Sequence, residues 1–369
     1  MRTTSSGGTR YRTRSYRTRP DVGFTQRSAP GDKGELRTPS FGSLRFPSCP
    51  RQATKWCCVS GKDWYPEEVE DDTGRDERRE KQDQQAKLIV GEILFTLWDL
   101  PPPRVIISVV GHGTSDCCEE MQDGVHILRH FRQGLRGALR ATRGWLVTVG
   151  TDDGLSSIVG QTMQEEMAST ALVDTVCLGI APLRRLHLQE EIEDSVKNGN
   201  GRFYDYQLTE SEKTRQRQHR RVGIEPNHTH MLLVDHDNDK WGAEIGLRKH
   251  VEDEICEHEL RRGETMRPPP MVCVVVNGGL LTLRMVKRSL DKGRPVVVLA
   301  QSGRAAKHIF QRSQYARHHN ERGLFSLADG ALAFSLSLSR IFPYPFFSIP
   351  FLPISAAGGA GFSPNARYF

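Results

Sequence analysis

The chain has 369 residues, of which 37% are hydrophobic and 26% are charged, and its formal net charge at pH 7 is +6. This hydrophobic fraction is lower than that of a typical globular chain, which indicates that part of the sequence lies outside any core. Six arginines and no acid fall within the first twenty residues. The remainder is closer to neutral, which disfavours nucleic acid as a partner, because such proteins carry a basic stripe on a folded surface.

The eight cysteines have the spacing of neither a zinc site nor a disulfide framework. Two pairs are adjacent, Cys57-Cys58 and Cys117-Cys118. We therefore expect free thiols, a reducing compartment and no bound metal. The first twenty residues contain no apolar stretch, which excludes a secretory signal, and a disordered tail is favoured over a mitochondrial transit peptide because no amphipathic spacing is present.

Residues 1–85 are predicted to form a disordered tail. Up to about residue 60 they mix Gly, Pro, Ser and Arg without apolar periodicity, and Glu67 to Lys87 is a dense charge run. The folded domain is expected to span residues 86–310. It begins with apolar residues near helical spacing from Leu88 to Leu97, which three prolines at 101–103 bring to an end.

Within this domain, short apolar runs rich in β-branched residues alternate with longer helical patterns. Continuous apolar runs are typical of strands whose two faces are both covered by helices, as in a parallel sheet. The predicted strands are 105–110, 145–149, 175–180, 231–234, 272–276 and 296–299, and the predicted helices are 125–139, 156–172, 243–260 and 280–290. The first helix is expected to bury Val125, Leu128, Leu135 and Leu139. The fold class is therefore α/β, with a doubly wound and mostly parallel sheet.

Two features complete the organisation of the predicted domain. The polar segment from Val196 to Gly223 is interpreted as a surface loop outside the sheet. Five predicted strands end in glycine or small polar residues: Gly111-His112-Gly113-Thr114-Ser115-Asp116, Gly150-Thr151-Asp152-Asp153-Gly154, Gly179-Ile180-Ala181-Pro182, Asn277-Gly278-Gly279 and Ser302-Gly303-Arg304-Ala305-Ala306.

Parallel strands end at one edge of a sheet, so these turns are expected to line a cleft. Glycine lets backbone amides approach a phosphate, and the helix amino termini that follow favour an anion. A single glycine turn is equally what any tight strand-to-helix connection needs. Asp116 stands where the dinucleotide fingerprint requires glycine or alanine, so an ordinary NAD dehydrogenase is disfavoured.

Six blocks resemble, in order and spacing, the amino-terminal region of melastatin-type transient receptor potential (TRPM) cation channels. They are VIISVVGHG, RGWLVTVGTDDGLSSIVGQ, CLGIAPL, PNHTHMLLVD with KWGAEIGLR, VCVVVNGG and RPVVVLAQSGRAA, and they cover roughly residues 89–310. The resemblance implies a Rossmann-like SLOG domain that in some members binds ADP-ribose or a related nucleotide, with no required cofactor. It further implies a cytosolic regulatory, ligand-sensing and assembly domain of a calcium-permeable channel in the plasma membrane or another cell membrane, with other TRPM subunits as partners.

The same resemblance places the ligand pocket in the turns after the strands. Arg304 is the phosphate partner that it implies, because a guanidinium can donate two parallel hydrogen bonds to a phosphate; a solvated arginine at a helix start is the alternative. The candidate binding residues are Gly111, Gly113, Gly150, Thr151, Gly154, Gly179, Gly278, Gly279, Ser302, Gly303 and Arg304.

The sequence departs from the family pattern in two of these turns. Asp152 and Asp153 place two carboxylates where they would repel a phosphate. His112 replaces a glycine that is usual in the family, and its ring occupies space that a ligand would need. A structural interaction domain with a vestigial cleft therefore stays open as an alternative function.

No catalytic residue is assigned, and we expect no enzyme. Relatives by fold that remove the base from a nucleoside monophosphate carry a glutamate after a glycine-rich turn, whereas Asn277-Gly278-Gly279-Leu280-Leu281 has none, so this is the less favoured alternative. His228 and His230 lack an evident third ligand, and we expect structural roles for both rather than metal binding.

Residues 311–369 are expected to be a Pro- and Phe-rich tail and not a domain. Four prolines between 343 and 353 would break a membrane-spanning helix, so no direct span is expected. Helical repeats, membrane spans and a coiled coil follow this region in a TRPM channel; we expect none of them within these 369 residues, and therefore no pore in this chain. We expect an incomplete or aberrantly spliced product whose tail derives from non-coding sequence.

Overall fold

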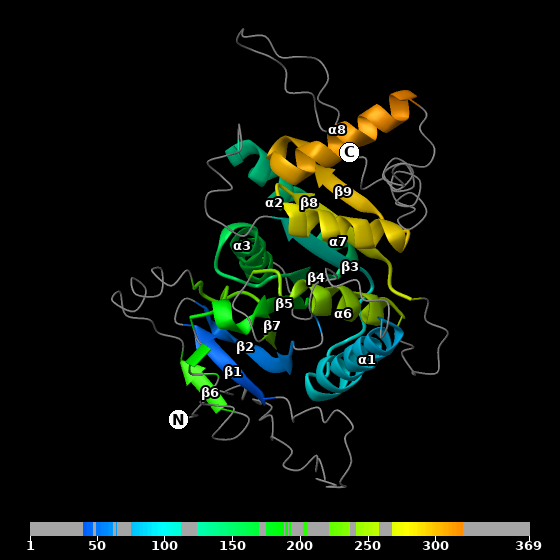
Figure 1. Ribbon diagram of the computed structural model, residues 1–369. Coiled ribbons are helices and arrows are strands. Elements are labelled where there is room, and N and C mark those ends of the chain that lie inside the picture. Colours follow the sequence, from blue (N-terminus) through cyan, green and yellow to red (C-terminus); the bar gives the residue numbers. More distant parts are fainter. Residues whose placement is uncertain are drawn as a thin grey trace, which may run out of the picture. The chain divides into compact units, whose positions relative to one another are not determined.

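The computed structural model describes residues 40–46, 49–61, 64, 75–111, 124–169, 175–187, 189–190, 192, 202–205, 221–236, 241–257 and 268–319. In these residues the chain forms one nine-stranded sheet with helices on both faces (Figure 1). The strands are β1 (Ser40–Phe46), β2 (Cys49–Ser60), β3 (Ile106–Gly111), β4 (Trp145–Thr148), β5 (Cys177–Pro182), β6 (Arg202–Asp205), β7 (His230–Asp235), β8 (Met271–Val276) and β9 (Val296–Leu299). The helices are α1 (Arg75–Leu88), α2 (Gly124–Thr142), α3 (Gly154–Ser169), α6 (Ile245–Glu257), α7 (Leu280–Asp291) and α8 (Arg304–His319).

The strand order across the sheet is β6-β1-β2-β7-β5-β4-β3-β8-β9. The β1–β2 pair is antiparallel, and each of the other pairings is parallel. In the centre, Ile106 of β3 lies in register with Trp145 of β4 on one side and with Met271 of β8 on the other. The predicted α/β class, with a doubly wound and mostly parallel sheet, is confirmed.

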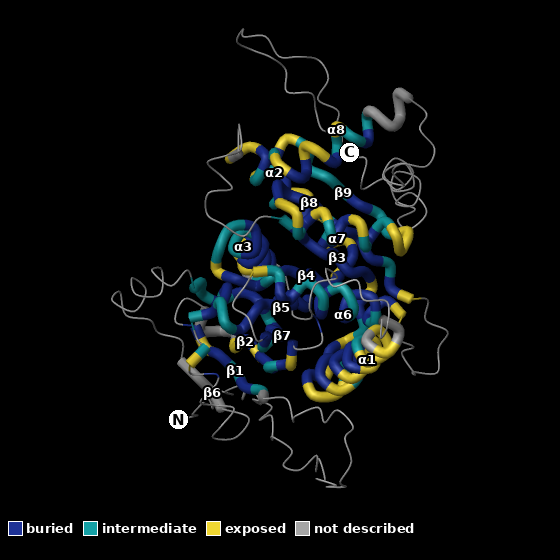
Figure 2. The backbone as a smooth tube through the Cα atoms, viewed as in Figure 1, coloured by how far each residue is buried: buried dark blue, intermediate teal, exposed yellow. Residues whose placement is uncertain are grey.

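Helices cover both faces of the central strands, as the continuous apolar runs predicted. On one face α1, α6 and the residues between α1 and β3 pack on β2, β7, β5 and β4, and α7 lies beside α6 over β3 and β8. On the other face α2 and α3 pack on β3 and β4. Figure 2 shows the result, with buried strands between helices whose outer sides are exposed. All four residues of β4 are buried, which explains its uninterrupted apolar sequence.

The predicted start of the folded domain, about residue 86, is wrong. β1 and β2 belong to the sheet, Trp64 is buried in the main core, and α1 begins at Arg75. In β2 the exposed Ala53 and Lys55 alternate with the buried Thr54 and Trp56, but Cys57 is buried as well, so the alternation is too short to be recognised in the sequence. At the other end α8 continues to His319, nine residues beyond the predicted end of the domain.

Two further expectations also need correction. The segment from Val196 to Gly223 is not purely a loop, because Arg202–Asp205 forms β6 and pairs with β1. In α2, Val125 is 72% exposed, and the buried stripe runs through Ile127, Phe131, Leu135 and Leu139. The helical period was right, but the stripe begins two residues later than predicted.

The apolar stretch after α1 is a π-helix, Ile89–Leu97. Its wider turn is visible in the hydrogen bond from the Trp98 amide to the Ile93 carbonyl, five residues back, at 2.9 Å. The wider turn buries adjacent pairs of residues, Ile89 with Val90 and Ile93 with Leu94. None of the described helices, including this one, combines the length and apolarity needed to cross a bilayer.

A buried ion pair fastens α6 to the centre of the sheet. Arg248 donates to Glu252 at 2.8 Å, to the Ser108 hydroxyl at 2.9 Å, and to the carbonyls of Val109 and Val147 at 3.0 and 3.1 Å. Ser108 in turn donates to Glu252 at 2.6 Å. A buried charge is tolerated only when it is paired and hydrogen-bonded in this way.

Candidate functional site

The strand order reverses between β3 and β8. From β3 the chain proceeds outward through β4, β5 and β7, then crosses back to β8 on the other side of β3 and continues to β9. Open α/β sheets bind ligands at such a switch point, outside the carboxyl ends of the strands. Gly111 ends β3 in register with Val276, which ends β8. A Cβ atom on Gly111 would overlap the Val276 carbonyl oxygen, so close packing of the two strands requires glycine here.

The turns after β8 and β9 are interlocked beside this point. The Asn277 amide donates to the Ser302 hydroxyl at 2.6 Å, and the Ala306 amide donates to the Asn277 carbonyl at 3.0 Å. The Ala305 amide lies 3.3 Å from the Gly278 carbonyl oxygen. These contacts fix the amino terminus of α7, which begins at Leu280, next to the amino terminus of α8, which begins at Arg304.

Both turns place non-glycine residues in the left-handed region of the backbone map. Asn277 has φ 57° and Arg304 has φ 42°, while Gly278 and Gly303 beside them have φ 93° and 89°. A left-handed conformation costs a residue with a Cβ about 1–2 kcal/mol, although asparagine tolerates it better than most. Strain of this kind tends to gather at ligand sites, so two strained residues in adjoining turns single out this part of the edge.

The Asn277 side chain is buried, with 1% of its surface exposed. Neither its Oδ1 nor its Nδ2 has a hydrogen-bond partner among the described residues. A Cβ atom on Gly303 would lie 3.9 Å from Nδ2, so the carboxamide points from the β8–α7 turn toward the β9–α8 turn. Buried polar side chains are nearly always paired, which makes this carboxamide an exception that needs an explanation.

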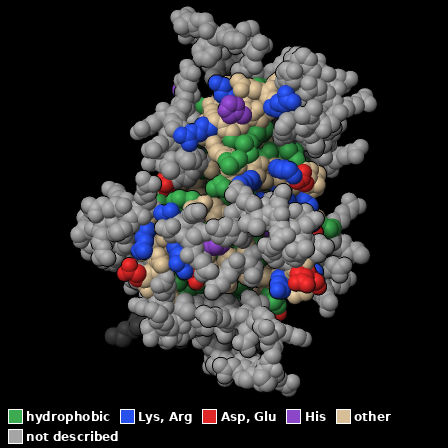
Figure 3. Space-filling model, viewed as in Figure 1, with side chains coloured by type: hydrophobic (Ala, Val, Ile, Leu, Met, Phe, Trp, Pro, Cys, Tyr) green, Lys and Arg blue, Asp and Glu red, His purple; other side chains and the backbone are tan. Residues whose placement is uncertain are grey.

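Apolar and basic side chains surround the two turns. Leu280 and Leu283, in the first turns of α7, are 66% and 39% exposed. Arg304 and Lys307, in the first turn of α8, are exposed. On the face drawn in Figure 3, hydrophobic side chains gather over the region of α7 and β8, with lysine or arginine side chains beside them. Such a surface suits a ligand that is both anionic and partly apolar.

The turn after β4 differs, because the protein itself occupies its backbone. The Gly150 amide donates to the Thr148 hydroxyl at 2.9 Å and lies 3.3 Å from the Ser156 hydroxyl. The Asp152 amide donates to the Gly223 carbonyl at 2.8 Å, and the Gly150 carbonyl accepts from the Glu225 amide at 3.0 Å. The segment 222–225 therefore lies along this turn and accepts from the Asp152 amide, a donor that a phosphate would need.

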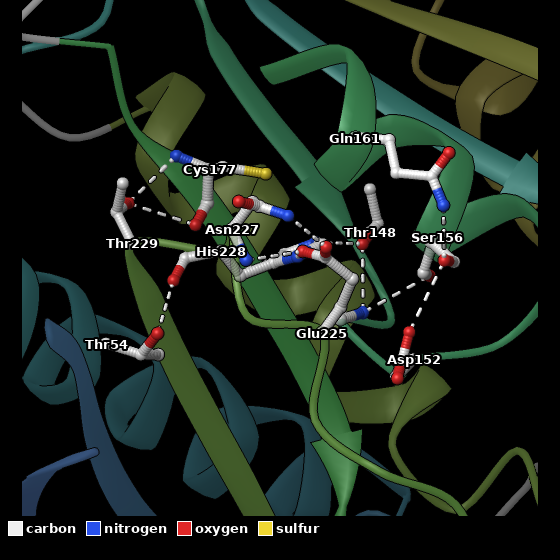
Figure 4. Close-up of polar contacts among 12 residues, drawn as sticks. Thr54, Thr148, Asp152, Ser156, Gln161, Cys177, Glu225, Asn227, His228 and Thr229 are labelled. Atoms are coloured by element: carbon white, nitrogen blue, oxygen red, sulfur yellow. Dashed lines mark hydrogen bonds and ion pairs between the residues drawn. The ribbon is translucent and has the colours of Figure 1, made fainter. Parts of the chain in front are cut away.

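A buried network anchors that segment (Figure 4). The Glu225 carboxylate accepts from the backbone and side-chain nitrogens of Asn227 at 2.9 and 2.6 Å, and from Nδ1 of His228 at 2.7 Å. Nε2 of His228 lies 2.7 Å from the Thr148 hydroxyl. Burial lowers the pKa of His228, but the neighbouring Cys177 side chain and the Glu225 carboxylate together raise it to about 10. His228 and Glu225 thus form a buried imidazolium–carboxylate pair.

Three glycines make room for this arrangement. A Cβ atom on Gly160, in the middle of α3, would overlap the Glu225 carboxylate. Gly150 and Gly179 pack against each other, and a Cβ atom on either would meet the Met231 side chain. Gly179 lies inside β5 and not in a turn after it, so its predicted position was wrong. Packing accounts for glycine at 160 and 179, and Gly150 also adopts a left-handed backbone conformation with φ 77°.

Asp152 and Asp153, the acids that depart from the family pattern, flank the same turn. Burial raises the pKa of Asp152, and the charge of Glu225 raises it further, while the Ser157 hydroxyl at 3.4 Å opposes the shift. Asp153 accepts from the Ser157 amide at 3.3 Å through its carbonyl and so belongs to the start of α3. A phosphate at this turn would be repelled by the negative charge of the Asp152 carboxylate.

The two histidines that suggested a metal site have separate surroundings. His228 belongs to the network with Glu225, whereas the His230 ring packs on Trp98 with 4.8 Å between the ring centroids. Burial, and then the charge of Lys55, lowers the pKa of His230 to about 3. In the described ranges no three His, Cys, Asp or Glu side chains gather as metal ligands.

The structure brings together five of the eleven sequence-predicted binding residues, at the turns after β8 and β9: Gly278, Gly279, Ser302, Gly303 and Arg304. Gly111 lies at the neighbouring strand end, and Gly150, Thr151 and Gly154 belong to the turn after β4. Gly113 falls outside the described residues. Whether these residues bind a ligand stays a prediction. Asn277 and the Glu225 network were not among the candidates, although an asparagine before two glycines is typical of a left-handed position.

The family model described as SLOG in TRPM matches residues 79–329, about two thirds of the chain. The chain belongs to this family. The resemblance drawn from the six sequence blocks is thereby confirmed. The matched range contains every strand from β3 to β9 in chain order. It also contains the two turns at the switch point, Asn277–Gly279 and Ser302–Arg304, which we call the switch-point site.

Three relatives of the SLOG-in-TRPM chain illustrate the extent of the similarity. The rat transient receptor potential cation channel subfamily M member 2 is 28% identical over 229 residues, which are 61% of this chain and 14% of the relative. A Nematostella vectensis subfamily M member-like 2 channel is 29% identical over 240 residues, 63% of this chain and 14% of the relative. A Caenorhabditis elegans transient receptor potential channel is 35% identical over 213 residues, 57% and 10% respectively. The chain therefore spans a small part of the length of these channels.

Proposed function

We propose that this SLOG domain is a cytosolic sensor of ADP-ribose or a related nucleotide, and an assembly domain, of a TRPM-type calcium-permeable cation channel. The channel part is supported by the family match and by the relatives, which are named as cation channels. The observation that carries the ligand part is the meeting of two interlocked, strained turns, Asn277–Gly279 and Ser302–Arg304, at the switch point of the sheet.

The surroundings of these turns match the chemistry of a nucleotide. The amino terminus of α7 presents the positive end of a helix dipole, which favours an anion by about 0.3–1 kcal/mol. Arg304 adds a guanidinium at the start of α8, a group suited to a phosphate. The exposed Leu280 and Leu283 offer apolar surface on which the nucleoside part can pack. We assign the binding function to this half of the edge and not to the turn after β4.

Titration calorimetry of the 369-residue chain with ADP-ribose tests this function. We expect saturable binding that is about tenfold weaker or more in Arg304→Ala, because a hydrogen bond between charged groups contributes about 1.5–3 kcal/mol. Lys287→Ala is the matched control, since Lys287 is an exposed cation on α7 that pairs with Asp291 at 2.7 Å, away from the helix start. Equal losses in both variants, or no binding to the unaltered chain, would contradict the proposal.

A second candidate function, a structural interaction domain with a vestigial cleft, is favoured by the turn after β4. There the Gly150 and Asp152 amides already donate to protein groups, and the Asp152 carboxylate opposes an anion. This function predicts no calorimetric signal together with a mass in light scattering above the 41.6 kDa of one chain. Chromatography of the nucleotide after incubation tests the third alternative, an enzyme, which predicts release of the free base.

A further inference from the structure

We infer that the Asn277 carboxamide forms hydrogen bonds with a vicinal pair of hydroxyl groups on the sugar of the bound nucleotide, and so determines the specificity of the switch-point site. The inference rests on the proposed nucleotide site and goes beyond it, because it names the ligand group and the side chain that recognises it. It starts from one unusual observation. The Asn277 carboxamide is 1% exposed, and both its oxygen and its nitrogen lack a partner in the part of the chain that the structure describes.

The chemistry of the carboxamide defines the group that it can recognise. The side chain offers two N–H donors on Nδ2 and an acceptor on Oδ1, and this holds whichever way the amide is turned about its last bond. Leaving either atom unpaired in a buried place is unfavourable, so the matching ligand group must both donate and accept. A hydroxyl group does both, and two adjacent hydroxyls can meet the two ends of one carboxamide at once.

A phosphate cannot fill this role. Its oxygens accept hydrogen bonds from Nδ2 but, when ionised, have no proton to donate to Oδ1. The cations that suit a phosphate lie on the other turn, where Arg304 and Lys307 open α8. The two turns therefore contribute different groups to the site. The β9–α8 turn offers charge, and the β8–α7 turn offers a neutral group that both donates and accepts.

The placement of Asn277 supports recognition and not only packing. Its amide and carbonyl are tied to Ser302 and Ala306 at 2.6 and 3.0 Å, which fixes the backbone from which the side chain extends. Its φ of 57° directs the chain through a left-handed turn that glycine would adopt more easily. The carboxamide faces Gly303, where the missing side chain leaves the space beside Nδ2 open. A fixed polar side chain beside an open position is the arrangement that specificity requires.

The test compares adenosine 5′-monophosphate with its 2′-deoxy analogue, which lacks one hydroxyl of the pair, by calorimetry on the 369-residue chain. We expect the unaltered chain to bind the ribose form about tenfold more tightly or more, because a buried polar group left without its partner penalises the wrong ligand. In Asn277→Gly this preference should disappear. Glycine adopts the local backbone conformation without strain, so this variant keeps the turn intact, and thermal unfolding checks its fold.

Asn277→Asp is the second variant, because it keeps the size of the side chain but replaces the N–H donors by an acceptor. We expect it to keep a preference for the ribose form, because a carboxylate accepts hydrogen bonds from both hydroxyls of the pair. A preference that persists in Asn277→Gly, or an unaltered chain that binds the two monophosphates equally or binds neither, overturns the inference. Binding of ADP-ribose in the same chain is measured separately, so that a site that binds nucleotide without reading the sugar is distinguished from a domain that binds no nucleotide.

Discussion

Gly160 in the middle of α3 provides the sharpest test of the buried network, because a single added methyl group would meet the Glu225 carboxylate. In Gly160→Ala the carboxylate has to move away from its three donors, the two Asn227 nitrogens and Nδ1 of His228. Breaking a buried ion pair costs about 3–5 kcal/mol. Replacing glycine by alanine inside a helix returns about 1 kcal/mol. We therefore expect Gly160→Ala to lower the free energy of unfolding by about 2–4 kcal/mol.

The matched control is Gly137→Ala in the middle of α2, where a Cβ atom would have nothing within 4 Å. The same chemical change should raise the free energy of unfolding there by about 1 kcal/mol, because only the helix propensity changes. Urea unfolding, followed by the fluorescence of buried tryptophans such as Trp145, measures both values. If Gly160→Ala stabilises the domain as Gly137→Ala does, the network does not hold the Glu225 carboxylate against Gly160.

Three further predictions follow from strain, charge and burial. Arg304→Gly should raise the free energy of unfolding by up to about 1 kcal/mol in thermal melts, because it removes left-handed strain, while calorimetry shows weaker nucleotide binding. The folded-state pKa of His228, about 10, lies above its unfolded value of 6.5. The protonated imidazole therefore contributes fully to the free energy of unfolding below pH 6.5, and this contribution is lost as the pH rises toward 10. Urea midpoints across this pH range should fall more steeply in the unaltered chain than in His228→Gln. Arg248→Met should lower the free energy of unfolding by about 3–5 kcal/mol by leaving Glu252 unpaired, and adding Glu252→Leu should recover part of that loss in the same urea experiment.

The sequence predicted the inner strands well, because their signal is local. The runs at 145–149 and 272–276 are apolar without interruption, and the structure buries all of β4 and most of β8 between two layers of helices. The strands on one side of the sheet, β6, β1 and β2, could not be found this way. β1 and β6 contain glycine, serine and charged residues and gain their stability from pairing across the sheet, between segments about 160 residues apart. A pairing over that distance leaves no periodic pattern in either segment.

The candidate site was predicted in outline and missed in its chemistry. Glycines after strands indicated the carboxyl edge, and the turns containing Gly278 and Gly303 do meet there. The sequence could not show that Gly150 and Gly179 serve to accommodate Met231, because that contact joins three separate strands or turns. Nor could it show that Glu225 binds His228 beneath α3, because the sequence block that contains His228 does not show which side chain the imidazole pairs with. Close packing and burial arise only when the segments come together.

The two halves of the edge therefore call for different explanations. At the turn after β4, each unusual feature improves packing or pairs a buried group: the glycines fit Met231 and Glu225, and the Gly150 amide has its acceptors. At the turns after β8 and β9, the unusual features lower stability, because Arg304 is strained and the Asn277 carboxamide is buried without a partner among the described residues. Local rules are most often broken where a site is built for a ligand. A domain that served only as an interaction scaffold would be more stable with glycine in place of Arg304, which is why we place the proposed ligand site on this half of the edge.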